Sequence, residues 1–100
     1  MGQSDGPSRG DAVPRKGVSL HLLGDQGVLF DLPAQRLYAA NTTASFIWCC
    51  LEERRPLRET CERLADTFGL RLADAETYVE GMVTQWRDLG LIDGGPYRGG

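Results

Sequence analysis

The stretch Arg36–Leu51, RLYAANTTASFIWCCL, decides how the rest of the chain is arranged. Its first five residues are typical of a short strand, and an apolar pattern with helical spacing begins after Asn41-Thr42-Thr43. Asn and Thr favour the start of a helix because their side-chain oxygen can accept a hydrogen bond from a free N–H of the first turn. The sequence therefore predicts a strand that ends at Asn41 and leads directly into a buried helix.

Two further strands are predicted before this junction and two further helices after it. The upstream runs alternate in polarity and end at turns that contain glycine or proline. Short links between successive strands favour an antiparallel meander whose third strand lies at an edge. The expected fold class is therefore α+β, with a three-stranded antiparallel sheet followed by three helices in a winged-helix-like arrangement. The expected strands are 18–23, 28–32 and 36–40, and the expected helices are 42–53, 56–68 and 74–89.

The composition is that of one small domain with loose ends. A content of 41% hydrophobic and 25% charged residues is ordinary for a globular domain. Residues 1–16 are rich in Gly, Ser, Pro and charge and lack periodicity, so they are expected to form a disordered N-terminal tail. We expect residues 17–93 to form the folded domain and residues 94–100 a flexible C-terminal tail.

The sequence predicts a cytoplasmic protein without a membrane segment. No apolar run approaches the roughly 20 residues of a membrane-spanning helix, and the N-terminus lacks the apolar core of a secretion signal. The three cysteines are an odd number, and Cys49 is adjacent to Cys50. This usage indicates reduced thiols that serve as small core residues.

No constellation of residues predicts catalysis. His21 has no Ser, Cys or carboxylate placed beside it, and Cys49 and Cys50 have no expected histidine neighbour. These three residues and Cys61 are spaced too irregularly for a zinc site. No glycine-rich phosphate loop precedes a helix. We therefore expect a protein that is not an enzyme, with no catalytic residue, no metal and no cofactor.

A winged-helix DNA-binding regulator is the main alternative, because the predicted order of elements suits that shape. The third helix would then meet the phosphates. It carries four carboxylates against one cation, and the chain has a net charge of −3, which is the wrong sign for phosphate contacts. The sequence therefore argues against a nucleic-acid partner. The four carboxylates are Asp74, Glu76, Glu80 and Asp88, and the cation is Arg87.

The predicted edge strand suggests a different function. Unpaired N–H and C=O groups along Arg36–Ala40 can pair with a strand from another chain. A few backbone hydrogen bonds at about 1 kcal/mol each cannot offset an association cost of roughly 4–15 kcal/mol, so side-chain pockets must contribute. The edges of two copies could also pair into a homodimer. Candidate pocket residues, each of which could instead fill the core, are Leu37, Tyr38, Val79, Met82 and Trp86.

Spaced residues through positions 18–92 carry a recognisable pattern. They are Val28–Leu32, Arg36-Leu37-Tyr38, Asn41 with Ala44, Ile47-Trp48, Leu64-Ala65, Phe68-Gly69 and Gly90-Leu91-Ile92. This pattern resembles the PqqD-like family, whose members are also called RiPP recognition elements. The resemblance implies a non-catalytic domain that binds the leader segment of a ribosomally made precursor peptide.

The resemblance also implies where the leader binds. In the family, the leader adds as a strand beside the third strand and lies in a groove against the third helix. The peptide-binding residues expected on this basis are Arg36, Leu37, Tyr38, Ala39, Ala40, Tyr78, Val79, Met82 and Trp86.

Within the family, the segment Asp31–Arg36 resembles the free-standing leader-binding proteins of lasso-peptide biosynthesis. This likeness implies that the leader is handed to a transglutaminase-like leader peptidase, after which a cyclase closes the ring. Two positions depart from the family pattern. Tyr78 stands where many relatives carry Asp, and Arg71 stands where a capping Asp is common, so the third helix is expected to begin at Asp74.

Overall fold

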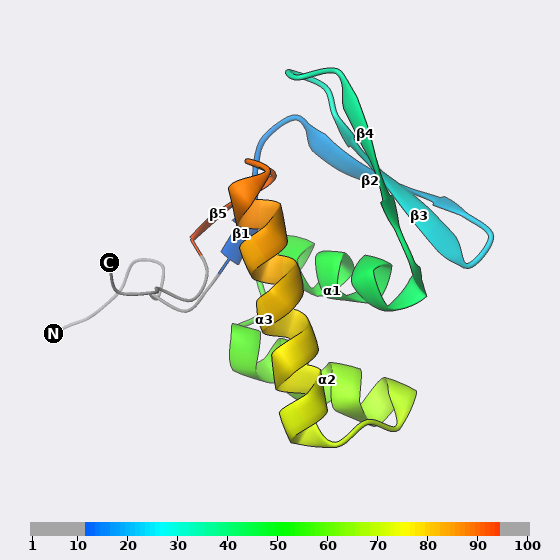
Figure 1. The fold of residues 1–100 in the computed structure, drawn as a ribbon, viewed down its shortest axis with the longest axis vertical. Helices are drawn as coiled ribbons and strands as arrows, with labels where there is room; N and C mark the ends of the chain where they lie inside the picture. The colour runs from blue at the N-terminus through cyan, green and yellow to red at the C-terminus, as the bar shows by residue number, and fades with distance from the viewer. Residues whose placement is uncertain (1–11, 95–100) are drawn as a thin grey trace, which may run out of the picture.

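The structure, a computed structural model, describes residues 12–94. An antiparallel sheet of strand order β2-β3-β4 precedes three helices, and β1 pairs with β5 in a separate two-stranded ribbon (Figure 1). The α+β class predicted from the sequence is therefore confirmed. The elements in chain order are β1 (Ala12–Pro14), β2 (Val18–Leu23), β3 (Gln26–Asp31), β4 (Arg36–Ala40), α1 (Thr42–Glu52), α2 (Leu57–Phe68), α3 (Leu72–Asp88) and β5 (Ile92–Gly94).

The sheet is a meander in which β3 starts two residues earlier than predicted. Gly24 has a φ of 69°, which glycine adopts at little cost, and a two-residue turn closes β2 onto β3. Leu29 is fully buried, whereas its neighbours Val28 and Phe30 on the opposite face of β3 are only half-buried. The face of β3 that packs on the helices is therefore the one that carries Leu29.

Helix α1 approaches the sheet closely at Gly27. A Cβ atom at this position would lie 2.5 Å from Ser45 Oγ and 2.8 Å from Leu20 Cδ1, so a side chain would push α1 away. Ser45 Oγ donates a hydrogen bond of 3.3 Å to the carbonyl of Ala40, which ties α1 to the end of β4. The glycine thus fixes the distance between the first helix and the strands.

The predicted cap of the first helix is present. Asn41 Oδ1 accepts a 2.8 Å hydrogen bond from the Ala44 N–H, and α1 begins at the next residue, Thr42. The face of α1 that points into the core includes Trp48, whose ring meets the ring of Trp86 edge-on at a centroid distance of 5.1 Å. Each such fully buried large side chain contributes about 1.5–3 kcal/mol. This contact holds α3 against α1.

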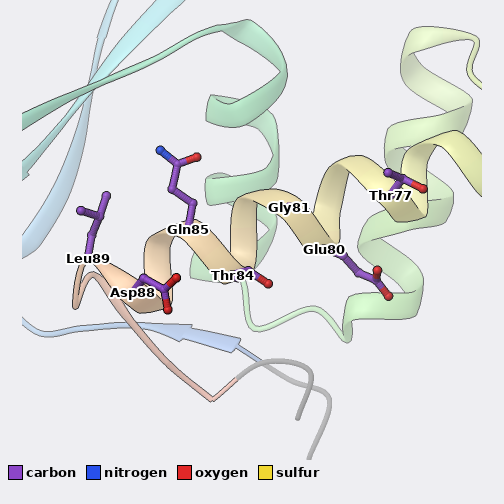
Figure 2. Close-up of a pocket in the computed structure, with 7 residues that line it drawn as sticks. All are labelled: Thr77, Glu80, Gly81, Thr84, Gln85, Asp88 and Leu89. Carbon is purple, nitrogen blue, oxygen red and sulfur yellow. The ribbon is translucent and has the colours of Figure 1, made fainter. Parts of the chain in front are cut away.

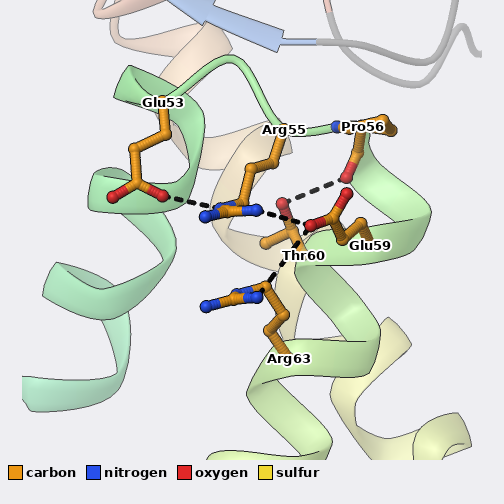
Figure 3. Close-up of polar contacts among 6 residues, drawn as sticks. All are labelled: Glu53, Arg55, Pro56, Glu59, Thr60 and Arg63. Carbon is orange, nitrogen blue, oxygen red and sulfur yellow. Dashed lines mark hydrogen bonds and ion pairs between the residues drawn. The ribbon is translucent and has the colours of Figure 1, made fainter.

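Polar contacts order the junction between α1 and α2. The Arg55 guanidinium contacts the carboxylates of Glu53 at 2.6 Å and Glu59 at 2.5 Å, and Arg63 approaches Glu59 at 4.0 Å (Figure 3). Thr60 Oγ1 donates a 3.2 Å hydrogen bond to the carbonyl of Pro56. Partly exposed ion pairs contribute little stability each, so the network mainly fixes the direction in which α2 leaves the turn.

The predicted start of the third helix is wrong. Helix α3 begins at Leu72 rather than at Asp74, because its first turn forms without a side-chain cap. Asp74 lies inside that turn, where a negative charge is favourable. At the end of α2, Phe68 is 37% exposed and precedes Gly69, whose φ of 67° turns the chain.

The folded part of the chain begins earlier than residue 17. Ala12–Pro14 pairs with Ile92–Gly94, and Ala12 and Ile92 are both buried in the core. Arg15 extends this ribbon, since its N–H donates to the Leu91 carbonyl and its guanidinium pairs with Asp93. The expected tail 1–16 is therefore wrong for residues 12–16. Residues 1–11 and 95–100, where the remaining parts of the two expected tails fall, lie outside the described residues.

Candidate functional site

Strand β4 has one free edge in the described part of the chain. It pairs with β3 on one side and has no strand on the other. Leu37, 68% exposed, projects from the outer face of the sheet, whereas Tyr38 is half-buried on the face that meets the helices. Backbone groups along this edge are therefore accessible next to an apolar surface. Of the other predicted β4 residues, Arg36 and Ala39 are exposed and Ala40 is buried.

A stripe of four residues on α3 faces the same region. Tyr78, Met82, Gln85 and Leu89 follow helical spacing, and the first two are half-buried against the core. Asn41 Nδ2 donates a 3.3 Å hydrogen bond to the Tyr78 hydroxyl. Since Asn41 directly follows β4, this bond places the stripe beside the end of that strand.

A shallow groove of about 610 Å³ runs along α3 next to this stripe. Figure 2 shows Gln85 and Leu89 pointing to the side on which the strands lie, and Thr84 and Asp88 pointing to the other side. At the middle of the groove, Gly81 has no side chain, and a Cβ atom there would meet nothing within 4 Å. The groove is lined by Thr77, Glu80, Gly81, Thr84, Gln85, Asp88 and Leu89.

Two of the predicted peptide-binding residues on α3 do not reach the surface. Val79 is 1% exposed and Trp86 is 3% exposed, because both project toward the core side of α3. They support the stripe from beneath and are not available for contact with a peptide. Gln85, Leu89 and Gly81 were not predicted, although a spacing of three and four residues from Tyr78 and Met82 leads to Gln85 and Leu89.

The residues weighed as catalytic or metal-binding candidates have the following surroundings. No three His, Cys, Asp or Glu side chains among residues 12–94 are grouped so that they could hold a metal ion. Burial, as the largest cause, raises the pKa of Cys61 to about 11 and raises the pKa of Cys49 and of Cys50. These thiols are therefore protonated at neutral pH and are poor nucleophiles. The expectation that no Ser lies beside His21 is wrong, because residues two apart on a strand share a face and the Ser19 hydroxyl contacts His21 Nε2 at 2.9 Å on the exposed face of β2.

Within residues 12–94, no helix has the length and apolar character needed to cross a bilayer.

Comparison with known proteins identifies the family. The sequence profile described as "Coenzyme PQQ synthesis protein D (PqqD)" matches residues 26–92, which is well over half of the chain. The chain belongs to the PqqD family. The resemblance seen in the sequence is thereby confirmed. Among curated proteins, no significant match is found.

Two solved structures share the fold of this PqqD-family chain. The first is "TbiB1 in Complex with the TbiA(beta) Leader Peptide", with a TM-score of 0.77, 18% identity, and coverage of 87% of this chain and 99% of TbiB1. The second is "Lasso peptide synthetase B1 complexed with the leader peptide", with a TM-score of 0.74, 20% identity, and coverage of 83% and 98%. At these identities the likeness concerns the fold.

Proposed function

We propose that this protein binds the leader segment of a ribosomally synthesised precursor peptide and does not itself catalyse a reaction. The observation that carries the proposal is the free edge of β4 beside the Tyr78–Leu89 stripe of α3. Membership of the PqqD family supports it. Further support comes from the two similar structures, both of which are complexes with a leader peptide.

The dimensions of the two surfaces fit one extended segment. The five residues of β4 extend over about 17 Å at roughly 3.4 Å per residue. The stripe from Tyr78 to Leu89 covers a similar length, about 17 Å at 1.5 Å per residue. The two surfaces are therefore each long enough for the same leader strand of about five residues.

The side chains determine which leader would bind tightly. Alternate residues of the added strand would point to the helices, where Tyr38, Met82 and Leu89 offer apolar contacts. Two apolar leader residues at about 1.5–3 kcal/mol each, with the backbone bonds of β4, are enough to offset much of the association cost of roughly 4–15 kcal/mol. We propose that Arg36, Leu37, Ala39 and Ala40 contribute mainly through their backbone.

The leader would then be passed to other enzymes. One of the two similar structures is a lasso peptide synthetase B1, which favours a lasso-peptide precursor as the ligand. In this role the protein would deliver the leader to a cytoplasmic, transglutaminase-like leader peptidase, and a cyclase would act next. A DNA-binding function gains no support, since α3 carries Asp74, Glu76, Glu80 and Asp88 against Arg87.

The proposal is tested with the fluorescently labelled leader of the precursor encoded beside this protein's gene. Titration monitored by anisotropy should give a dissociation constant at least tenfold higher for the Tyr38→Ala/Met82→Ala variant than for the unaltered chain. Leu57→Ala is the matched control, because Leu57 is also half-buried against the core but lies on α2. Equal affinity of the double variant and the unaltered chain would remove the apolar contacts of Tyr38 and Met82 from the proposal.

A further inference from the structure

A second, apolar pocket lies between α1, the C-terminal end of α2 and the β2–β3 turn. The α1 residues that line it repeat at helical spacing. The pocket has a volume of about 250 Å³, which is enough for one or two large side chains. None of the residues proposed to bind the leader lines it. Its lining residues are Leu22, Gly24, Asp25, Thr42, Ser45, Phe46, Cys49 and Phe68.

The walls of this pocket are apolar and fixed. Leu22 is 59% exposed, and the ring of Phe68 meets the ring of Phe46 edge-on at a centroid distance of 5.5 Å. Thr42 Oγ1 donates a 2.5 Å hydrogen bond to the carbonyl of Asp25, which holds the β2–β3 turn against α1. Large apolar side chains left exposed around a preformed hollow are typical of a binding surface.

The pocket adjoins the other free edge of the sheet. In the described residues, β2 pairs with β3 and has no strand on its outer side. Leu22 and Gly24, which line the pocket, lie at the end of β2 and in the turn that follows it. A free strand edge next to an apolar hollow suits an extended polypeptide that inserts a side chain.

Carboxylates are among the charges close to the pocket. Asp25 is the one charged residue among those that line it. The pKa of Cys49, a half-buried thiol in the lining, is raised by burial and then by the carboxylates of Glu52 and Glu53. Arg55 pairs with Glu53, whereas Glu52 accepts a hydrogen bond from the neutral Trp48 indole at 2.9 Å. A ligand with a basic residue beside its apolar one complements this field.

We propose that the β2 edge and this pocket form a second docking site, for an extended segment of a partner protein in which a large apolar side chain is flanked by Lys or Arg. The role of the site rests on the proposed function, because a leader-binding protein without catalytic residues must bring the leader to an enzyme. The two sites use opposite edges of the sheet, so one molecule can hold the leader and the partner at the same time.

The test uses two synthetic peptides, Ac-KFKLK-NH2 and Ac-EFELE-NH2, added to the ¹⁵N-labelled full chain. The basic peptide should shift amide resonances of the pocket residues, including those of Leu22, Asp25 and Phe46, and should bind at least fivefold more tightly than the acidic peptide. Leu22→Ser should weaken the basic peptide at least fivefold. Leu32→Ser is the matched control, because Leu32 is 58% exposed and lies outside the pocket, and it should leave the affinity unchanged.

A second variant keeps the test independent of packing. Asp25→Asn retains the backbone carbonyl that Thr42 contacts, so it should preserve the fold and weaken only the basic peptide, about threefold. The proposal is overturned if the basic peptide causes no shifts, if the shifts are confined to β4 and α3, or if both peptides bind equally well. It is also overturned if the pocket resonances shift when the protein concentration alone is raised, because the occupant would then be a second copy of the chain.

The leader proposal is measured separately in the same samples. Saturation with the basic peptide should leave the affinity for the labelled leader unchanged, and competition between the two would overturn the second site as a distinct one. If the basic peptide binds as expected and the leader does not bind, the docking site stands and the proposed function fails.

Discussion

Gly81 offers a perturbation in which stability and binding should change in opposite directions. It lies in the interior of α3, where glycine is less favourable than alanine by about 0.5–1 kcal/mol. An added Cβ would meet no atom within 4 Å, so Gly81→Ala gains this amount without a clash. For a domain of this size, the melting temperature should rise by roughly 2–8 °C.

Binding of the leader should weaken at the same position. Gly81 lies in the groove beside Gln85 and Leu89, so a side chain there enters the space that the leader would use. Gly81→Leu keeps a good helix former and fills more of that space. An overpacking cost of about 1–3 kcal/mol in the complex corresponds to a dissociation constant raised roughly 5- to 150-fold. Gly81→Ala should show a smaller increase.

Thermal unfolding followed by circular dichroism, together with anisotropy titration of the labelled leader, measures both effects. Thr67→Leu, on the exposed side of α2, is the control for an added apolar side chain on a helix and should leave leader binding unchanged. Unaltered leader affinity in Gly81→Leu would refute the use of this groove. A melting temperature lower in Gly81→Ala than in the unaltered chain would refute the claim that a side chain at position 81 meets no other atoms.

Three further predictions concern the fold. Gly27→Ala should lower the free energy of unfolding by about 1–3 kcal/mol in urea titrations, because the new methyl group would meet Ser45 Oγ at 2.5 Å, and unchanged stability would show that α1 can shift at no cost. Asn41→Ala removes the cap of α1 and the hydrogen bond to Tyr78, so the free energy of unfolding measured by thermal denaturation should fall by about 0.5–2 kcal/mol. A smaller decrease would show that the cap does not stabilise the fold. The pKa of Cys61 is raised from 9.0 to about 11 in the folded state, so folding favours the protonated thiol. The stability that the protonated thiol contributes is complete below pH 9.0 and is lost as the pH rises through 11. Denaturant titrations should therefore show that the free energy of unfolding falls less steeply between pH 9 and 11 in Cys61→Ala than in the unaltered chain. The same pH dependence in both would contradict the raised pKa of Cys61.

The parts of the fold that follow from local signals could be predicted from the sequence. The junction at Asn41 depends on a cap and a helical repeat within a few residues, and both appear where expected. The pairing of β1 with β5 could not be predicted, because it joins the two ends of the domain: Val13 pairs with Asp93, and the adjoining Arg15–Asp93 contact spans 78 residues. The buried face of β3 was also beyond local reasoning, since both faces carry apolar residues and the close approach of α1 at Gly27 selects one of them.

The candidate site could be predicted as a region but not in full detail. Tyr38 on β4 and Tyr78 and Met82 on α3 are half-buried, and none of the three lines the groove itself. Val79 and Trp86 follow the same apolar repeat, but a small rotation about the axis of α3 separates residues that face the core from residues that face β4. Only the packing of Trp86 on Trp48 fixes that rotation, and it brings Gln85 and Leu89 to the groove.

Hydrogen exchange at the edge of β4 tests the central claim most directly. Amide exchange rates measured by NMR with and without saturating leader should show at least tenfold slower exchange for outward-pointing N–H groups within Arg36–Ala40, because an added strand would bond to them. The amides on the free edge of β2 should not change. Protection that appears along β2, or leader binding without protection of β4, would contradict the account.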